Sequence, residues 1–184
     1  MHFKRIQQFP TLESERLILR PFTLEDVEEW YVIHQDPEVT RYTGDGGVIS
    51  KEEVKRRIKD HVLADYVRHG FGRWVVVHKE DNCLIGFTGL KYIPEMKVVD
   101  LGYRFARKYW GQGIATEACK KALDFGFNDL KLDRVKAYII PANIGSQKVL
   151  EKLEFEFVRE LYEEGELEHE YALSSEKYFN SFSH

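Results

Sequence analysis

Three strand-like segments follow one another through the middle of the chain, and this run limits the fold more than any other feature of the sequence. Residues 72–79, 83–93 and 97–105 are rich in β-branched and aromatic side chains. The breaks between them hold turn signals, Asp81-Asn82 and Pro94, and are too short for a crossover connection. We therefore expect these segments to pair as antiparallel neighbours in one sheet.

Helical and strand-like segments flank this central run. In chain order they are a strand at 15–21, helices at 23–35 and from Ser50 to about Gly70, a helix at 114–128, a strand at 134–140, a helix at 144–153 and strands at 155–162 and 166–173. The order β α α β β β α β α β β predicts the α/β (α+β) class, with a mixed, mostly antiparallel sheet flanked by helices.

The length of the chain fits one domain over residues 1–184, with a core at about 12–173 and short flexible ends. With 43% hydrophobic and 32% charged residues, the chain has the composition of a folded globular protein. The first ten residues lack the apolar run of a secretory signal, and no stretch approaches the roughly 18 apolar residues of a membrane span. We expect no membrane partner.

Charge and cysteine usage narrow the function classes further. The formal net charge is −4, so we expect no nucleic-acid partner. The two cysteines, Cys83 and Cys119, have neither metal-ligand nor redox spacing. We therefore expect no metal site, and a reducing, cytoplasmic setting.

A glycine-containing loop precedes the helix at 114–128 and carries the strongest chemical signal. Gly111 and Gly113 stand directly before the helix, whose first N–H groups and dipole form a site for an anion. Glycines there let the backbone approach a phosphate. Between Arg104 and Lys121, five basic residues accompany a single acid, Glu117. The stretch is typical of a phosphate site, although a glycine turn beside a solvated basic face gives the same pattern.

Two common nucleotide motifs do not fit this loop. The dinucleotide fingerprint needs G-x-G-x-x-G in a parallel unit, whereas Gly111-Gln-Gly-Ile-Ala-Thr116 lacks the third glycine and follows antiparallel-looking strands. No Walker lysine follows the loop either.

The same loop resembles the pyrophosphate loop of the GNAT superfamily of N-acetyltransferases, written Q/R-x-x-G-x-G/A. The sequence YWGQGIATEA at 109–118, preceded by LGY at 101–103, is similar to the RimJ/RimL branch, which acetylates protein N-termini and some small amines. The opening ERLILRPFTLEDVEEW and the later PANIGS at 141–146 and KLEF at 152–155 match the branch in order and spacing. The resemblance covers about residues 12–173.

The resemblance implies acetyl-CoA as co-substrate and a position for it. Acetyl-CoA would lie between the strands at 97–105 and 134–140, with the backbone of Phe105 and Ala106 pairing with its pantetheine amides. Its pyrophosphate would lie on the amides of Gly111, Gln112, Gly113, Ile114, Ala115 and Thr116. Gly102 within its strand predicts a β-bulge that frees backbone N–H groups, unless the glycine serves packing alone.

Asn143 and Ser146 are carried over from the same branch. The matching Asn binds the cofactor and the matching Ser lies near its sulfur. Asn143 is therefore a predicted cofactor contact, and Ser146 is a candidate to protonate the departing thiolate or to relay a proton through water. Either residue could instead simply cap the helix at 144–153.

Three positions depart from the pattern of the family. Trp110 replaces the Gln or Arg of the loop motif, and Glu154 replaces a glycine after the helix. Leu150 replaces a tyrosine that protonates the thiolate in many relatives, so another acid or water must supply that proton.

The reaction also needs a base, because free amines are mostly protonated at pH 7. Asp100 lies on the strand beside the expected thioester and is our candidate, with surface pairing to Lys97 as the alternative. Glu117 is more typical of a first-turn helix acid. The histidines expected only on the surface or in packing are His34, His61 and His78.

The acidic segment from Glu160 to Glu170 holds six glutamates and no Lys or Arg. This is typical of a solvated hairpin, and it could also attract a cationic amine. Trp30, Tyr31 and Tyr42 could form the opposite wall of an acceptor cleft or pack in the core.

We therefore expect an enzyme: an N-acetyltransferase that transfers the acetyl group of acetyl-CoA to a primary amine, on a protein N-terminus or a small molecule, in a ternary complex. A non-catalytic acyl-CoA-binding or regulatory domain of the same fold remains an alternative. A phosphate-binding protein for another nucleotide is a third possibility. Either a monomer or a homodimer is expected.

Overall fold

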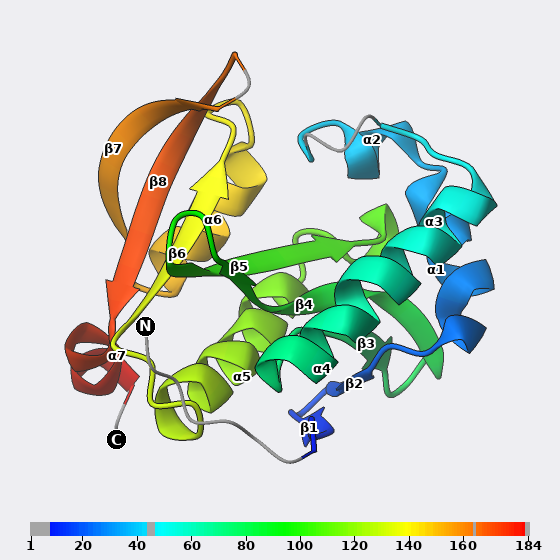
Figure 1. Cartoon of the computed structure of the whole chain (residues 1–184), viewed down its shortest axis with the longest axis horizontal. Coiled ribbons are helices and arrows are strands. Elements are labelled where there is room, and N and C mark those ends of the chain that lie inside the picture. The colour runs from blue at the N-terminus through cyan, green and yellow to red at the C-terminus, as the bar shows by residue number, and fades with distance from the viewer. Residues whose placement is uncertain (1–7, 44–46, 164, 183–184) are drawn as a thin grey trace.

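Hydrogen bonds join eight strands into one sheet, in the order β1-β2-β3-β4-β5-β6-β8-β7. The computed structural model describes residues 8–43, 47–163 and 165–182 (Figure 1). The strands are β1 (Leu12–Glu13), β2 (Leu17–Pro21), β3 (Arg73–His78), β4 (Cys83–Ile93), β5 (Val98–Phe105), β6 (Arg134–Ile139), β7 (Glu156–Glu163) and β8 (Glu166–Ser174). Neighbouring strands are antiparallel except β5 and β6, which are parallel.

Helices cover both faces of this sheet (Figure 1). The helix α5 lies on one face, and α1, α3 and α4 lie on the other. The helical segments are η1 (Leu24–Asp26), α1 (Val27–His34), α2 (Pro37–Thr40), α3 (Lys51–Arg57), the π-helical η2 (Ile58–Leu63), α4 (Ala64–His69), η3 (Arg107–Tyr109), α5 (Ile114–Asn128), α6 (Ile144–Lys152) and α7 (Ser175–Phe182). The predicted class, one domain with a mixed and mostly antiparallel sheet, is confirmed.

The parallel strands β5 and β6 stay together only near their first residues. Their one matched pair is Asp100 with Lys136. Beyond it β5 continues to Phe105 beside β4, whereas β6 continues to Ile139 beside β8. The two strands therefore diverge toward their C-terminal ends, and β6, β7 and β8 form an arm at an angle to the rest of the sheet (Figure 1).

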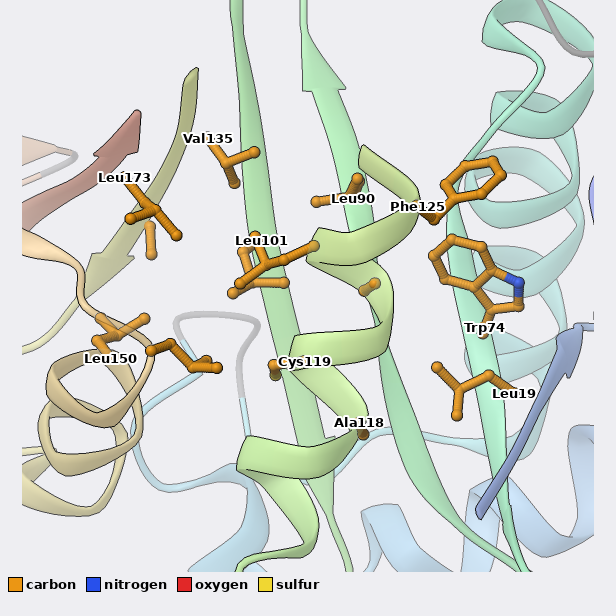
Figure 2. Close-up of a cluster of buried hydrophobic side chains, with 14 of the residues drawn as sticks. Leu19, Trp74, Leu90, Leu101, Ala118, Cys119, Phe125, Val135, Leu150 and Leu173 are labelled. Carbon is orange, nitrogen blue, oxygen red and sulfur yellow. The ribbon is translucent and has the colours of Figure 1, made fainter. Parts of the chain in front are cut away.

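The apolar stripe of α5 anchors that helix to the sheet. The stripe predicted from the sequence is at most 3% exposed and consists of Ile114, Ala118, Ala122 and Phe125. Figure 2 shows α5 packed over Leu90 and Leu101, with Leu150 of α6 beside it. Deleting a side chain of this kind costs about 2–5 kcal/mol, so the packing holds the start of α5 firmly in place.

The described residues outside 12–173 pack against the rest of the domain. Residues Ser175–Phe182 form α7, where Tyr178 is 2% exposed, packs on Phe127 and donates a hydrogen bond to Asp124. At the other end, Phe9 stacks on Trp74, and the indole N–H of Trp74 donates to the carbonyl of Pro10 at 2.8 Å. Aromatic burial orders both segments.

The described residues lack two features that would point to a membrane or a metal. None of their helices combines the length and the apolar character that crossing a bilayer requires. Within the same residues, no group of three or more His, Cys, Asp or Glu side chains is arranged to hold a metal ion.

Candidate active site

Two cavities lined by described residues meet where β5 and β6 diverge. The loop cavity, of about 520 Å³, lies between α6 and the segment from η3 to the start of α5. The sheet cavity, of about 490 Å³, lies between strands β3 to β5 and the helices α1, α3 and η2. Six residues line both cavities: Tyr42, Thr43, Tyr103, Arg104, Asn143 and Ser146. The end of β5 and the start of α6 therefore form a junction that is accessible from two sides.

Glycines shape the start of α5 at the loop cavity. Gly111 and Gly113 have φ values of 73° and 76°, in the left-handed region that glycine adopts without strain. No atom lies within 4 Å of the position that a Cβ of Gly111 would take. The amide of Glu117 makes the bond to the carbonyl of Gly113 at 3.0 Å, which leaves the three preceding amides without a partner inside the helix. Those amides belong to Ile114, Ala115 and Thr116, which line the loop cavity.

Gln112 is turned away from both cavities. Its side-chain Nε2 donates to the carbonyl of Lys108 at 2.7 Å, and its own carbonyl accepts from Arg16 Nη1 at 2.9 Å. The described residues that line either cavity do not include it. The side chain of Gln112 is thus engaged within the loop. A contact between its backbone amide and the cofactor stays a prediction.

The backbone at the end of β5 is partly committed to other groups. The amide of Ala106 donates to the carbonyl of Ile85 at 2.8 Å, so it faces β4 and not the gap. The carbonyl of Phe105 accepts from the indole N–H of Trp110 at 2.8 Å. Because backbone groups alternate along a strand, the N–H of Phe105 faces the gap. The Ala106 N–H is therefore engaged by β4, and pairing of the Phe105 and Ala106 backbone with pantetheine stays a prediction, with the Phe105 N–H as its available donor.

Gly102 does not form the expected bulge. The register of β4 with β5 runs without a shift from Ile93↔Val98 to Gly86↔Phe105, with Gly89 opposite Gly102. The backbone groups in the gap are freed by the divergence of β5 from β6. Gly102 instead makes room for a side chain, because Arg73 Nη2 lies 3.0 Å from the position that its Cβ would take.

The sequence left open whether Asn143 and Ser146 cap the helix at 144–153 or act at the cofactor, and the two residues differ in this respect. Asn143 is the N-cap of α6, and its Oδ1 accepts from the amide of Ser146 at 3.1 Å. Ser146 lies within the first turn and is not the cap. Both line both cavities, so capping accounts for Asn143 and does not account for the Ser146 hydroxyl.

Tyr103 is a junction residue to which the sequence assigned no role. Its hydroxyl donates to the carbonyl of Ser146 at 3.2 Å. Burial raises the pKa of Tyr103 far above its usual range, so the phenol keeps its proton. Its place in the Leu-Gly-Tyr segment directly before the loop was the available signal. By contrast, Leu150 is fully buried in the core and does not line either cavity among the described residues.

The departure at Glu154 has a local consequence. This residue has a φ of 64°, and it follows α6 where a glycine adopts the left-handed region more easily. A non-glycine residue in that conformation costs about 1–2 kcal/mol.

The candidate acids and bases lie in different surroundings. Asp100 lines the sheet cavity, opposite Lys91 of β4. Glu117 accepts from Ser14 Oγ at 2.7 Å and from the Arg16 amide at 2.9 Å, so it is a helix-start anchor. His34 is packed and not exposed: it is 2% exposed, and its Nε2 lies 2.7 Å from Arg104 Nη1. Since arginine only donates, this His34 nitrogen accepts.

The cations of the loop cavity only partly match those expected, since Arg104 of the basic stretch lines it and other residues of that stretch do not. Arg107 pairs with Asp36 at 3.1 Å and Lys108 pairs with Asp81 at 3.1 Å, so these two residues of the basic stretch bind carboxylates outside the cavity. Lys148 and Lys152 of α6 line the cavity. Their i, i+4 spacing on one helix face was the signal that sequence reasoning missed.

The sheet cavity is lined by more cations than carboxylates. Its described lining holds Arg57, Arg73, Lys91 and Arg104 against Asp100 and Glu168. Two glutamates of the acidic hairpin are engaged elsewhere: Glu170 is 1% exposed and pairs with Lys136 and Arg159, and Glu160 lies 3.4 Å from His169. Glu168 of the same hairpin lines the sheet cavity, so attraction of a cationic amine by this segment stays a prediction. The side chains of residues 163 and 164 lie outside the described set.

Trp30, Tyr31 and Tyr42 were expected either to pack or to line an acceptor cleft. Trp30 packs on Phe87 in the second core cluster and also lines the sheet cavity. Tyr42 lines both cavities. Tyr31 packs at the edge of that cluster.

Comparison with known proteins identifies the family. Residues 16–156 match the model of the acetyltransferase (GNAT) domain. The protein named "Uncharacterized N-acetyltransferase p20" of Bacillus licheniformis is 35% identical over 150 residues, which are 79% of this chain and 82% of that protein. The "Uncharacterized N-acetyltransferase YoaA" of Bacillus subtilis is 31% identical over 149 residues, 80% of this chain and 84% of that protein.

Solved structures share the whole architecture. An acetyltransferase (GNAT family) from Bacillus anthracis has a TM-score of 0.77 at 27% identity and covers 91% of this chain and 99% of its own. RimL, a ribosomal L7/L12 alpha-N-protein acetyltransferase in complex with coenzyme A, has a TM-score of 0.78 with the same coverage, and at 18% identity it is similar in fold alone. Together with the sheet that opens between β5 and β6, the family match over most of its length makes this chain an enzyme of the GNAT acetyltransferase family, whose members use acetyl-CoA.

Proposed function

We propose that this enzyme transfers the acetyl group of acetyl-CoA to a primary amine by direct attack in a ternary complex. Acetyl-CoA would occupy the loop cavity and the amine would occupy the sheet cavity. The observation that carries this proposal is the junction, because Tyr103, Asn143 and Ser146 line both cavities. Two reactants that enter from opposite sides would meet there.

A covalent enzyme intermediate has no support in the cysteines. Cys119 is fully buried, and this burial raises the pKa of its thiol to about 12. A thiol that stays protonated is a poor nucleophile. Cys83 is half-buried, and its Sγ lies 3.5 Å from the hydroxyl of Tyr109. The described lining of the two cavities includes neither cysteine.

The residues of the loop cavity fit acetyl-CoA. The free amides at the start of α5 suit a pyrophosphate, and the glycine at 111 leaves the space for its approach. Lys148 and Lys152 supply positive charge from the facing helix. The Phe105 N–H would donate a hydrogen bond to a carbonyl oxygen of the pantetheine arm. When bound, acetyl-CoA supplies a thioester whose carbonyl carbon accepts the amine.

Proton transfer would fall to two side chains at the acceptor side and the junction. Asp100 would accept the proton of the incoming ammonium, directly or through one water molecule, because it lines the sheet cavity. Ser146 Oγ would relay a proton: it would donate its own to the departing sulfur and take up the one that the nitrogen loses as the amide forms. Tyr103, which bonds to the Ser146 carbonyl, would hold the start of α6 in position.

The test is a pair of measurements on the full chain. Titration calorimetry with CoA and acetyl-CoA tests the loop cavity, and free-thiol release over a panel of primary amines tests transfer. We expect binding at micromolar to near-millimolar concentration and amine-dependent thiol release. Absence of binding at near-millimolar ligand would refute the proposal.

A non-catalytic acyl-CoA-binding domain of the same fold is the second candidate. Leu150 favours it, since the position of the family's acidic tyrosine is here a buried apolar side chain. That candidate predicts tight acetyl-CoA binding with no turnover on any amine. A binding protein for another nucleotide would instead show competition between CoA and ATP or NAD.

Several finer assignments belong to the same proposal. The RimJ/RimL branch, and with it a protein N-terminus or a small amine as acceptor, rests on the motifs at 101–118 and 141–155. A cytoplasmic location rests on the two free cysteines. A monomer or homodimer is proposed.

A further inference from the structure

Arg73 of β3 is a cation of the sheet cavity, and no ion pair within the described residues joins its guanidinium to a carboxylate. Its Nε is buried and has no hydrogen-bond partner among the residues that the structure describes. Its Cζ lies 4.9 Å from the ring centroid of Phe87, so an aromatic face supports it on one side. Burying an arginine without an anion is costly unless a ligand supplies one.

Two glycines let this side chain cross the sheet. Arg73 is opposite Gly89 of β4, and Gly89 is opposite Gly102 of β5. A Cβ on Gly89 would lie 2.5 Å from Arg73 Cα, and a Cβ on Gly102 would lie 3.0 Å from Arg73 Nη2. The guanidinium therefore lies against Gly102 of β5, one residue before the junction residues of that strand.

The surroundings of Arg73 add positive charge. Lys91 of β4 lines the same cavity. Asp65 of α4 feels both cations, which lower its pKa, yet burial is the larger cause and raises that pKa overall. The cavity offers a fixed guanidinium fork and a second cation to an incoming anion.

We propose that the acceptor carries a carboxylate that binds Arg73, with its amine one or two carbons away from that carboxylate. This inference rests on the proposed function. An arginine fork binds a carboxylate through two parallel hydrogen bonds. The guanidinium lies beside Gly102. The junction residue Arg104 is two residues further along β5, on the same face of the strand and about 6.6 Å away along it. An acceptor whose carboxylate binds Arg73 therefore places its amine at the junction when one or two carbons separate the two groups. A longer chain would carry the amine past the junction.

The same chemistry comes from two sources, a free amino acid and a peptide that begins with Asp. In both, an amine and a carboxylate are separated by one or two carbons. A polyamine lacks the carboxylate, and its other ammonium groups would meet Arg73 and Lys91. The cavity therefore selects against that class.

The experiment measures thiol release with acetyl-CoA and matched amines. The panel holds α- and β-amino acids, the carboxamide of each, the peptides Asp-Ala-Ala and Asn-Ala-Ala, and spermidine. It is run on the wild type, on Arg73→Gln, on Arg73→Lys and on Arg134→Gln as a control. Arg134 is an exposed strand arginine that is absent from the described lining of both cavities. Calorimetry with CoA on each variant checks that the loop cavity is intact.

We expect the wild type to favour a carboxylate over its carboxamide by about 10- to 100-fold in kcat/KM. Arg73→Gln should remove that preference, chiefly by raising KM for the carboxylates. Arg73→Lys should be intermediate, and Arg134→Gln should match the wild type. Preference for free amino acids or for Asp-Ala-Ala identifies the source.

Two outcomes would overturn the inference while the proposed function stands: equal use of carboxylate and carboxamide, or a preference that survives Arg73→Gln. Thiol release with no amine of the panel, despite CoA binding, would instead refute the proposed function and the inference with it.

Discussion

Arg16 and Glu117, which are 101 residues apart, join the residue before β2 to the first turn of α5. Arg16 Nε and Nη2 both lie 2.7 Å from Glu117 Oε2, and the Arg16 amide donates to Oε1 at 2.9 Å. Arg16 Nη1 also donates to the carbonyl of Gln112 at 2.9 Å. The pair therefore holds the glycine loop and the helix start together. Glu117 is a positioning residue, and its carboxylate is not available as a base.

Substitution of this anchor should loosen the loop. In Glu117→Gln, the charge-assisted bonds to Arg16 are lost, which we expect to lower the free energy of unfolding by about 1–3 kcal/mol. Acetyl-CoA affinity should fall by about 5- to 10-fold, because the loop amides are less well ordered. Urea denaturation and calorimetry measure the two effects. Glu176→Gln, a first-turn acid of α7, is the matched control and should leave acetyl-CoA affinity unchanged.

The same anchor should make stability depend on pH. Burial alone would raise the pKa of Glu117, but the bonds from Arg16 and Ser14 outweigh it and hold the pKa below its usual value. A lowered folded-state pKa gives stability that is present above the unfolded pKa of about 4.3 and is lost as the pH falls through the folded pKa. The gap in unfolding free energy between wild type and Glu117→Gln should thus be wide at pH 7 and narrow at pH 3. A gap that does not change with pH would contradict this.

Ser146 is predicted to act in the chemical step. Ser146→Ala should lower kcat by about 10-fold or more, because the proton donor to the departing sulfur is removed. Acetyl-CoA affinity should stay nearly unchanged, since the cap of α6 is Asn143. Steady-state kinetics and calorimetry separate the two quantities. Ser181→Ala, on an exposed position of α7, controls for loss of a hydroxyl, and an unchanged kcat in Ser146→Ala would leave the serine no chemical role.

Lys148 and Lys152 are predicted to attract the phosphates of CoA. Each of Lys148→Gln and Lys152→Gln should weaken CoA binding by about 3- to 10-fold at low salt, with a smaller effect at high salt because of screening. Lys55→Gln removes an exposed last-turn lysine of α3 and serves as control. Calorimetry at two salt concentrations measures the effect. Equal affinity in all three variants would show that the phosphates lie elsewhere.

Much of the fold could be predicted because its signals are local. α5 has its predicted bounds since an apolar stripe at helical spacing follows a glycine N-cap, and β4 has its predicted bounds between two turn signals. Helix α7 was not predicted from the sequence, although the segment contains three aromatic residues, Tyr178, Phe179 and Phe182. Its order comes from packing on Phe127 of α5, a long-range contact that no local pattern states.

The site was predicted less completely than the fold, because contacts between distant segments shape it. The loop glycines and Asn143 carry local signals, and both were found in the predicted places. Gly102 signalled an unusual position, but its cause is Arg73, two strands away across the sheet. The cations of the loop cavity were assigned to residues 104–121, whereas Arg107 and Lys108 pair with distant carboxylates and α6 contributes the lysines. Side-chain pairing between distant segments decides these cases.

The most direct test of the central claim is initial-velocity kinetics, with thiol release followed while acetyl-CoA and an amine substrate are both varied. A ternary complex at the junction of the two cavities predicts release that depends on both reactants, with double-reciprocal lines that intersect. Parallel lines would contradict direct attack, and thiol release that no amine accelerates would contradict acetyl transfer to an amine.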